Sequence, residues 1–328
     1  VEMTARSLSA ALATGNTVVI KTPEITPLSN AWFAQAAEAA GFPAGSVNIV
    51  CGLGQDAGAA LSGHSHINQI VFTGSVPTGI AIATAAAGNV VPCVLELGGK
   101  SAAIVHDDAD LEAFENDVRW GIFFNAGQVC SAMSRVIVHE SRHEELIDRI
   151  TGIAKSLSVG PGIERDTFGP NMGAMVSNAQ RDRAAGMVSD AVLAGAKVAA
   201  GGRRMNIPGA FLEPTILSNV TPDMTIANEE VFGPVLSVLT FRDDEEALAI
   251  SNGTPYGLVG GVFTRDLDRA TFAARKIRAG QVFVNEWYAG GVETPFGGYG
   301  KSGYGREKGR EALWNYVQTK NVAIRLKG

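Results

Sequence analysis

Two residues in the first half of the chain combine the chemistry and the setting of catalytic groups. Cys130 follows the polar, Gly-containing turn 124–129, and a nucleophilic thiol needs backbone N–H groups beside it to hold the oxyanion that its attack creates. Glu96 lies in the apolar run 94–97, where burial would raise the pKa of a carboxyl toward that of a general base. Both residues also have a plainer interpretation, as a small buried hydrophobe and as half of a structural ion pair.

Three turns that follow predicted strands could bind a nucleotide. Segment 52–57 fits the GxGxxG/A pattern, but Phe72 stands near the position where an acid should bind the ribose, so a plain tight turn is an equal alternative. The turn 72–75 offers free N–H groups at a helix start, which can hold a pyrophosphate. Lys21 and Glu24 lie at the end of the first strand, where they could bind ribose hydroxyls or form a solvated surface pair.

Alternating helix and strand patterns must position these groups. Near-continuous apolar strands separated by helices predict parallel sheets covered on both faces, with right-handed crossovers and a doubly wound layout. The predicted strands are 17–21, 47–50, 69–72 and 94–97, then, after a hinge at Gly98-Gly99, 102–105, 135–139, 235–241, 258–263 and 281–285. The predicted helices are 3–14, 31–40, one ending at 87, 111–120, 144–156, 179–194, 245–251 and 269–277.

Composition excludes several classes of function. The 328 residues, 46% of them apolar, suffice for about two domains, and a net charge of −6 argues against nucleic acid as a partner. No apolar run approaches the ~18 residues that span a membrane, and the first residues do not resemble a signal peptide. Cys51, Cys93 and Cys130 lack metal-ligand spacing and fit a reducing compartment. We therefore expect a cytoplasmic protein with no metal.

Five segments resemble, in order, the sequence blocks of the NAD(P)-dependent aldehyde dehydrogenases. Segment 95–100, Leu-Glu-Leu-Gly-Gly-Lys, resembles the glutamate signature of that family, and 124–130 resembles its cysteine signature. Cys130 lies 130 − 96 = 34 residues after Glu96. The other three blocks are 72–75, 229–234 and 295–298, so that the resemblance covers essentially the whole chain.

This resemblance implies the oxidation of an aldehyde to a carboxylic acid. Cys130 would form a thiohemiacetal with the aldehyde and, after hydride transfer to the nicotinamide, a thioester. Glu96 would activate the water that hydrolyses this thioester. NAD is expected rather than NADP, because the charge of Glu24 beside the adenosine ribose would repel a 2′-phosphate.

The resemblance also implies contacts for the cofactor and the substrate. Residues matching the family's adenosine, pyrophosphate and nicotinamide contacts are Lys21, Glu24, Gly54, Gly74, Ser75, Gly79, Glu230 and Phe232. Residues matching the surroundings of the aldehyde are Arg6, Asn285, Trp287 and Tyr288. Arg6 would recognise a distal carboxylate on the substrate, although a surface arginine is the alternative, and the two aromatic residues would equally suit an aromatic aldehyde.

The implied architecture is a Rossmann-like doubly wound parallel sheet for the cofactor, a second α/β catalytic domain and a terminal oligomerisation strand. The domains would be 1–99 for NAD, 100–300 for catalysis and 301–328 for a return segment. Its strand, 321–326, would pair with a neighbouring subunit in a homodimer or homotetramer. Val1 matches the residue directly after the family's Pro-Trp-Asn-Phe-Pro block. In the family, the Asn of this block would donate the second hydrogen bond to the oxyanion. We therefore expect the catalytic activity of the isolated chain to be impaired.

Two other functions remain open at the level of the sequence. In a CoA-acylating relative a thiol would replace water in deacylation, although Glu96, a base suited to activating water, argues against it. The chain could also be a catalytically impaired fragment that still binds a nucleotide. An assay for NADH formation with and without CoA separates these functions.

Overall fold

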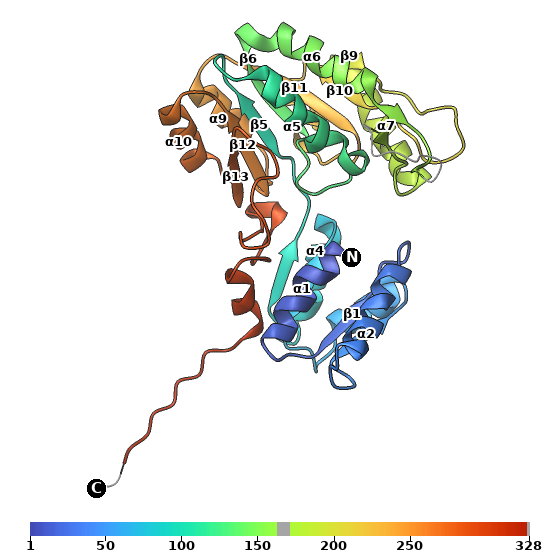
Figure 1. Cartoon of the computed structure of the whole chain (residues 1–328), viewed down its shortest axis with the longest axis vertical. Coiled ribbons are helices and arrows are strands. Elements are labelled where there is room, and N and C mark those ends of the chain that lie inside the picture. Colours follow the sequence, from blue (N-terminus) through green and yellow to red (C-terminus); the bar gives the residue numbers. More distant parts are fainter. Residues whose placement is uncertain (163–170, 327–328) are drawn as a thin grey trace. The chain divides into compact units, whose positions relative to one another are not determined.

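The computed structural model describes residues 1–162 and 171–326, which form two compact units. Unit 1 contains Val1–Glu96, Gly290–Gly297 and Gly303–Gly328, and unit 2 contains Leu97–Ala289 and Gly298–Ser302 (Figure 1). The chain therefore passes from unit 1 to unit 2 directly after Glu96. None of the described helices is long and apolar enough to cross a membrane.

Unit 1 holds two small sheets and their flanking helices. Strands β1 and β2 pair in parallel, and in the other sheet β4 pairs in parallel with β3 and antiparallel with β14. The strands are β1 Val18–Lys21, β2 Val47–Val50, β3 Ile70–Thr73, β4 Cys93–Glu96 and β14 Gly303–Tyr304. The helices are α1 Glu2–Ala13, α2 Leu28–Ala39, η1 Gly54–Gly58, α3 Ala59–Ser62, α4 Val76–Ala87 and η6 Glu311–Tyr316.

Unit 2 is built on one seven-stranded sheet. Its strand order is β13-β12-β5-β6-β11-β10-β9, and every neighbouring pair is parallel except β10 with β9. The strands are β5 Ala102–Val105, β6 Arg135–His139, β9 Lys197–Ala200, β10 Thr215–Ser218, β11 Val235–Phe241, β12 Val259–Phe263 and β13 Gln281–Val284. Another short pair is β7 Ser158–Val159 with β8 Asn171–Met172.

Helices cover this sheet, and side-chain caps mark where several of them begin. The helices are α5 Leu111–Phe123, α6 His143–Ser156, α7 Asn178–Leu193, α8 Thr225–Asn228, α9 Asp244–Asn252 and α10 Leu267–Lys276, joined by the turns η2 Phe124–Gly127, η3 Glu140–Arg142 and η5 Gly300–Ser302. Asp110, Ser177, Asp243 and Asp266 each accept a hydrogen bond from the first turn of the helix that follows. Strands β5 and β12 carry only buried residues, as strands covered on both faces must.

The α/β class and the doubly wound parallel sheet are confirmed, and three details differ from the predictions. The four predicted strands of the first hundred residues are divided between two sheets. Strands β7, β8, β9, β10 and β14 were not predicted. Residues 317–326, predicted to end in a strand, form no helix or strand, because a strand needs a hydrogen-bonded partner and no described segment of the chain supplies one.

Candidate active site

The turn before Cys130 in unit 2 has an unusual backbone. Asn125, Ala126 and Gly127 are all left-handed, with φ of 51°, 53° and 70°, which is costly for the two residues that carry a Cβ. The side-chain amides of Asn125 and Gln128 each donate to the backbone carbonyl of the other residue, at 3.1 and 3.0 Å. The turn therefore holds Cys130, which is half-buried and forms no disulfide, on a fixed backbone.

Gly99 brings the Cys130 loop against the start of β5. A Cβ on Gly99 would lie 2.7 Å from the backbone oxygen of Cys130, closer than real Cβ contacts allow. Only glycine lets the two backbones approach this closely without a shift. The glycine pair of the hinge thus has a packing function that its sequence pattern did not reveal.

The same glycine pair holds Glu230. The backbone N–H of Gly99 donates to Glu230 Oε1 at 3.1 Å, and a Cβ on Gly98 would meet the carboxylate at 2.1 Å. Burial raises the pKa of Glu230, while the hydrogen bond from Gly99 opposes this shift. Arg183 on α7 donates to the backbone oxygen of Glu230 at 3.0 Å. Phe232, two residues on, is left-handed with φ of 53° and partly exposed.

Trp287 and Tyr288 pack beside the Cys130 loop. The indole N–H of Trp287 donates to the backbone oxygen of Ser131 at 3.2 Å, and its backbone N–H donates to Asp117 at 2.6 Å. The Tyr288 hydroxyl donates to the backbone oxygen of Gly121 at 3.3 Å. Burial, and to a smaller extent Cys130, raises the pKa of Tyr288. Both aromatic side chains therefore lie near the predicted nucleophile.

Asn285 lies at the carboxyl end of β13, and its side chain is fully engaged there. Its Oδ1 accepts from the backbone N–H of Thr264, and its Nδ2 donates to the backbone oxygen of the same residue, both at 2.9 Å. Thr264 directly follows β12. The amide thus ties β12 to β13 at the end of the sheet opposite to the Cys130 loop, which precedes β6.

In unit 1, three predicted cofactor residues lie together at the ends of β1 and β2. Glu24 Oε1 accepts from Lys21 Nζ at 2.9 Å and from the backbone N–H of Gly54 at 2.5 Å. These hydrogen bonds, that from Lys21 first, lower the pKa of Glu24 to about 2. A charged carboxylate and an ammonium at this exposed edge are suitable partners for ribose hydroxyls.

The other predicted cofactor residues of unit 1 form the start of α4. Ser75 is the N-cap, and its hydroxyl accepts from the backbone N–H of Thr78 at 3.4 Å. Gly74 precedes the cap, and its backbone N–H donates to the backbone oxygen of Glu96 at 3.0 Å. Gly79 is buried in the first turns. The N-terminus of this 12-residue helix presents backbone N–H groups and a positive dipole end to an anion.

Glu96 ends β4 and is almost completely buried, at 2% exposure. Neither carboxylate oxygen has a hydrogen-bond partner among the described residues. Burial first, and the charge of Glu307 second, raise its pKa to about 8 against the opposing charges of Arg6 and Arg306. A buried carboxyl with unused oxygens is able to hold a proton near neutral pH and release it above that.

Arg6 lies within the same unit and faces Glu307. Its guanidinium forms an ion pair with Glu307 Oε2 at 3.0 Å and lies 4.5 Å from the centre of the Phe296 ring. The Ser7 hydroxyl donates to the other Glu307 oxygen at 2.6 Å. The structure therefore places Arg6 in a buried ion pair that also acts on Glu96.

The sequence patterns did not reveal two buried charged residues, Glu307 in unit 1 and Lys100 in unit 2. Glu307 follows a Gly-rich segment that gave no signal of burial. Lys100 ends the glutamate signature and is 2% exposed, and its Nζ has no hydrogen-bond partner among the described residues. Burial and Arg135 lower the pKa of Lys100 to about 7, against the opposing charges of Glu229 and Glu230. The described residues contain no group of His, Cys, Asp and Glu that could hold a metal ion.

Each unit of this α/β fold thus carries its own polar groups: the Cys130 loop and Glu230 lie in unit 2, and Glu96 and the Lys21–Glu24 edge lie in unit 1. A family model described as "Aldehyde dehydrogenase family" matches residues 1–322. The chain belongs to the aldehyde dehydrogenase family.

Curated relatives agree with this membership over nearly the whole chain. An aldehyde dehydrogenase of Emericella nidulans is 44% identical over 97% of this chain and 64% of its own length. The rat "Aldehyde dehydrogenase, cytosolic 1" is 41% identical over 97% of this chain and 63% of its own. The chain thus spans less than two thirds of the length of these relatives.

Solved structures of the family have the same fold. An aldehyde dehydrogenase from Bacillus cereus in complex with NAD⁺ matches with a TM-score of 0.95 and 43% identity, covering 99% of this chain and 66% of that one. A betaine aldehyde dehydrogenase variant from Staphylococcus aureus, also in complex with NAD⁺, matches with a TM-score of 0.93 and 38% identity, covering 96% and 65%.

Proposed function

We propose that the protein oxidises an aldehyde to a carboxylic acid with NAD, Cys130 acting as nucleophile and Glu96 as base. The observation that carries the proposal is the buried Glu96 carboxyl, with no hydrogen-bond partner among the described residues and a pKa raised to about 8. Burial of a carboxyl without a hydrogen-bond partner costs free energy, and groups with strongly shifted pKa values are concentrated at functional sites. Membership of the family supports an oxidoreductase in general, and the burial of Glu96 supports its role as the base.

The covalent chemistry belongs to Cys130. Its sulfur bonds to the carbonyl carbon of the aldehyde, and the oxyanion that forms needs backbone N–H donors, which the rigid 124–130 turn would offer. NAD, when bound, supplies the acceptor for the hydride that leaves this carbon. The acyl group then remains on the sulfur as a thioester.

Glu96 would complete the reaction by activating water. The carboxylate takes a proton from water, the hydroxyl adds to the thioester carbon, and the Cys130 sulfur leaves as the carboxylic acid is released. Glu307 and Arg6 would together tune the pKa of Glu96, because the charge of Glu307 raises it and the charge of Arg6 lowers it.

Each unit carries polar groups that would suit one part of NAD. Lys21, Glu24 and Gly54 would hold the adenosine ribose, and Gly74, Ser75 and Gly79 the pyrophosphate; Glu230 would hold the nicotinamide ribose and Phe232 the nicotinamide. The hydrogen-bonded Glu24 is fully ionised at neutral pH and would disfavour the 2′-phosphate of NADP. The two neighbouring structures that were solved with NAD⁺ support the same choice.

On the substrate side, we assign Trp287 and Tyr288 to the wall of the aldehyde site, since both pack beside the Cys130 loop. Asn285 would act from further away, by fixing the segment that carries these aromatic residues. Arg6 would bind a distal carboxylate of the substrate only if that carboxylate displaced Glu307 from the ion pair. The substrate is thus proposed as a small aldehyde.

We also propose a homodimer or homotetramer in a reducing, cytoplasmic setting. Val322, Ile324 and Leu326 of the extended terminal segment are highly exposed, and a strand partner in a second subunit would cover them. The three cysteines form no disulfide. One relative, from rat, is named cytosolic, and another, from Leishmania tarentolae, is named mitochondrial.

The test is an assay of NADH and acid formation from aldehyde and NAD, run with and without CoA. The proposal predicts equal amounts of NADH and free acid, independent of CoA. An absolute requirement for CoA would instead establish an acylating enzyme. NAD binding without turnover would establish a catalytically impaired fragment.

A further inference from the structure

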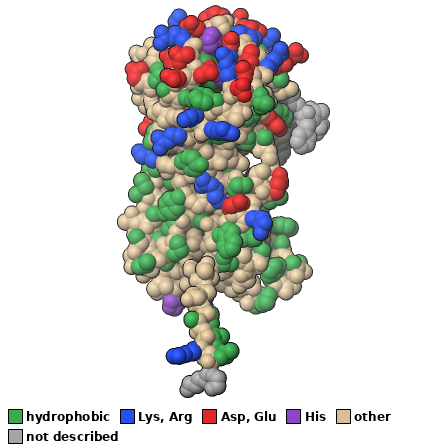
Figure 2. All heavy atoms as spheres, turned by 90° about the vertical axis from the view of Figure 1, so that its left-hand side faces the viewer, with side chains coloured by type: hydrophobic (Ala, Val, Ile, Leu, Met, Phe, Trp, Pro, Cys, Tyr) green, Lys and Arg blue, Asp and Glu red, His purple; other side chains and the backbone are tan. Residues whose placement is uncertain are grey.

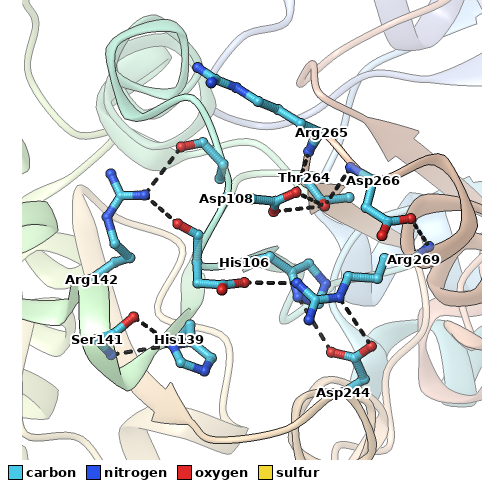
Figure 3. Close-up of polar contacts among 12 residues, drawn as sticks. His106, Asp108, His139, Ser141, Arg142, Asp244, Thr264, Arg265, Asp266 and Arg269 are labelled. Carbon is cyan, nitrogen blue, oxygen red and sulfur yellow. Dashed lines mark hydrogen bonds and ion pairs between the residues drawn. The ribbon is translucent and has the colours of Figure 1, made fainter.

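At the carboxyl ends of its parallel strands, unit 2 carries charged side chains that bond to one another. Figure 2 shows acidic and basic side chains gathered close together on this unit. Asp108, after β5, accepts from the Thr264 hydroxyl at 2.8 Å and from the backbone N–H of Arg265 at 3.0 Å (Figure 3). Arg269 pairs with Asp107 at 2.7 Å. These contacts hold the segments after β5 and β12 together and have no part in the proposed reaction.

Arg183 of α7 uses its guanidinium differently. It donates to the backbone oxygens of Glu230 and Val231, at 3.0 and 3.1 Å. Three residues earlier, the side-chain amide of Gln180 donates to the backbone oxygens of Val231 and Phe232, at 2.9 and 3.0 Å. These two side chains, the α7 donors, therefore bind three consecutive carbonyl groups in the segment 230–232.

The sequence of α7 places both donors on the face that meets this segment. Residues three and four apart in a helix are neighbours on its surface, so Gln180, Arg183 and Ala184 share one face. Ala184 is buried, and a Cβ on Gly233 would lie 3.2 Å from its Cβ. The small residues at 184 and 233 let the helix approach closely, and the two longer side chains reach the carbonyls.

The segment 230–232 depends on the α7 donors for its conformation. It lies between α8 and β11, and no backbone N–H of the described residues donates to its three carbonyls. Val231 is buried, where a carbonyl without a hydrogen bond costs free energy. Phe232 is left-handed, with φ of 53°, a conformation that persists only when its surroundings hold it. The α7 donors thus stabilise the backbone that carries Glu230.

The chain just before α7 also meets the Cys130 loop. The backbone N–H of Val176 donates to Gln128 Oε1 at 2.8 Å. Gln128 belongs to the rigid turn that leads to Cys130. The first part of α7 and the residues before it therefore contact both the loop of the proposed nucleophile and the segment that carries Glu230.

We propose that Gln180 and Arg183 are positioning residues, which hold Glu230 and Phe232 where the nicotinamide half of the cofactor binds beside the Cys130 loop. This inference rests on the proposed function, which assigns Glu230 to the nicotinamide ribose. The α7 donors act through the backbone of the segment 230–232 and need not touch the cofactor themselves. Their loss should therefore weaken the binding of NAD and spare ligands that lack the nicotinamide ribose.

Calorimetric titration of the full chain with NAD and with ADP tests the proposal without turnover. ADP carries the adenosine and the pyrophosphate, which are assigned to residues of unit 1, and lacks the nicotinamide ribose. Gln180→Met keeps the size of the side chain and removes the donor. Arg183→Met changes an exposed residue, which folding tolerates. Each variant should weaken NAD binding by ~10-fold, because two hydrogen bonds that hold the segment are lost, and leave ADP binding unchanged.

Two variants with the same changes of side chain serve as controls. Gln35→Met on α2 and Arg275→Met on α10 are at exposed positions and should leave both affinities unchanged. Unchanged NAD binding in Gln180→Met and Arg183→Met would overturn the proposal. An equal loss of NAD and ADP binding in these variants would also overturn it, because the effect would then not be confined to the nicotinamide half.

Glu230→Ala separates a failure of this inference from a failure of the proposed function. If Glu230→Ala weakens NAD binding and neither Gln180→Met nor Arg183→Met does, the role of the α7 donors is refuted and the assignment of Glu230 stands. If none of the three variants weakens NAD binding, Glu230 does not hold the ribose, and both the assignment and the inference are refuted.

Discussion

Glu96 shows how burial sets the chemistry of a single side chain. Removal of its carboxyl from water is the largest cause of the rise in its pKa to about 8, and the charge of Glu307 is second. The group is therefore mostly protonated at pH 7 and becomes a base only as pH rises. In the unfolded chain it would ionise near 4.5, so its contribution to stability declines as pH increases from there to about 8.

Hydrolytic turnover should follow that titration. The steady-state rate is expected to rise with pH through about 8, because only the ionised Glu96 accepts a proton from water. Glu96→Gln should flatten the profile and lower steady-state turnover by ~10²–10⁴-fold, while an initial burst of NADH remains. Stopped-flow absorbance measures both phases, and an unchanged profile in the variant would rule out Glu96 as the base.

Only one of the three cysteines should be required for activity. Cys130→Ala is expected to abolish aldehyde oxidation, because that cysteine follows the left-handed turn and packs against Gly99. Cys51→Ala and Cys93→Ala serve as matched controls in unit 1 and should retain activity. Wild-type turnover by Cys130→Ala in an NADH assay would contradict the assignment.

At the scale of elements, the hinge between β4 and β5 fixes the Cys130 loop by close backbone contact. Gly99→Ala would place a Cβ 2.7 Å from the Cys130 oxygen, and relief of that contact must move the loop. We expect a loss of ~1–3 kcal/mol in stability together with a large loss of activity. Gly186→Ala in α7, with open space around its Cβ, should be neutral or stabilising by up to ~1 kcal/mol. Urea denaturation and turnover measure both, and equal results for the two variants would refute the close-contact account.

The edge formed by β1, β2 and the turn at Gly54 should determine cofactor choice. Glu24→Gln removes the charge that opposes a 2′-phosphate and leaves the Lys21 ammonium to attract it. The ratio of kcat/KM for NAD to that for NADP should fall by roughly tenfold or more. Glu38→Gln, on the exposed face of α2, is the control. A ratio that stays constant in both variants would mean that Glu24 does not contact the ribose.

Local patterns predicted most elements because buried parallel strands are continuous apolar runs. β5, β6, β11 and β12 are of this kind, and each was placed to within one residue at either end. β9 was missed because only three small or β-branched apolar residues follow Lys197. β10 was missed, although it is fully buried, because only two of its four residues are apolar. The trio of Lys21, Glu24 and Gly54 was anticipated because all three follow strands at one edge.

At the scale of the whole molecule, contacts between distant parts of the chain were invisible to local reasoning. Arg6 and Ser7 meet Glu307, and the Asn16 amide donates to the backbone oxygen of Tyr316 at 2.9 Å, in each case about 300 residues away. Glu307 gave no sequence signal because neither a charge nor its Gly-rich context reveals burial. Residues from the beginning and from the end of the chain thus pack together in unit 1.

Removal of the Glu307 charge should destabilise unit 1 and lower the pKa of Glu96. Glu307→Gln leaves the buried Arg6 guanidinium without its counter-ion, which should cost about 3–5 kcal/mol in the free energy of unfolding. Because the charge of Glu307 raises the pKa of Glu96, the pH profile should also shift to lower pH. Glu311→Gln, an exposed glutamate of η6, should change neither. A shift in stability without a shift in the pH profile would contradict the proposed coupling.

The most direct test of the proposed reaction is to trap its covalent intermediate. Glu96→Gln protein is incubated with an aldehyde and NAD, digested, and analysed by peptide mass spectrometry. The account predicts an acyl group on the peptide that contains Cys130 and none on those that contain Cys51 or Cys93. An unmodified Cys130 peptide, or acylation of another cysteine, would contradict it.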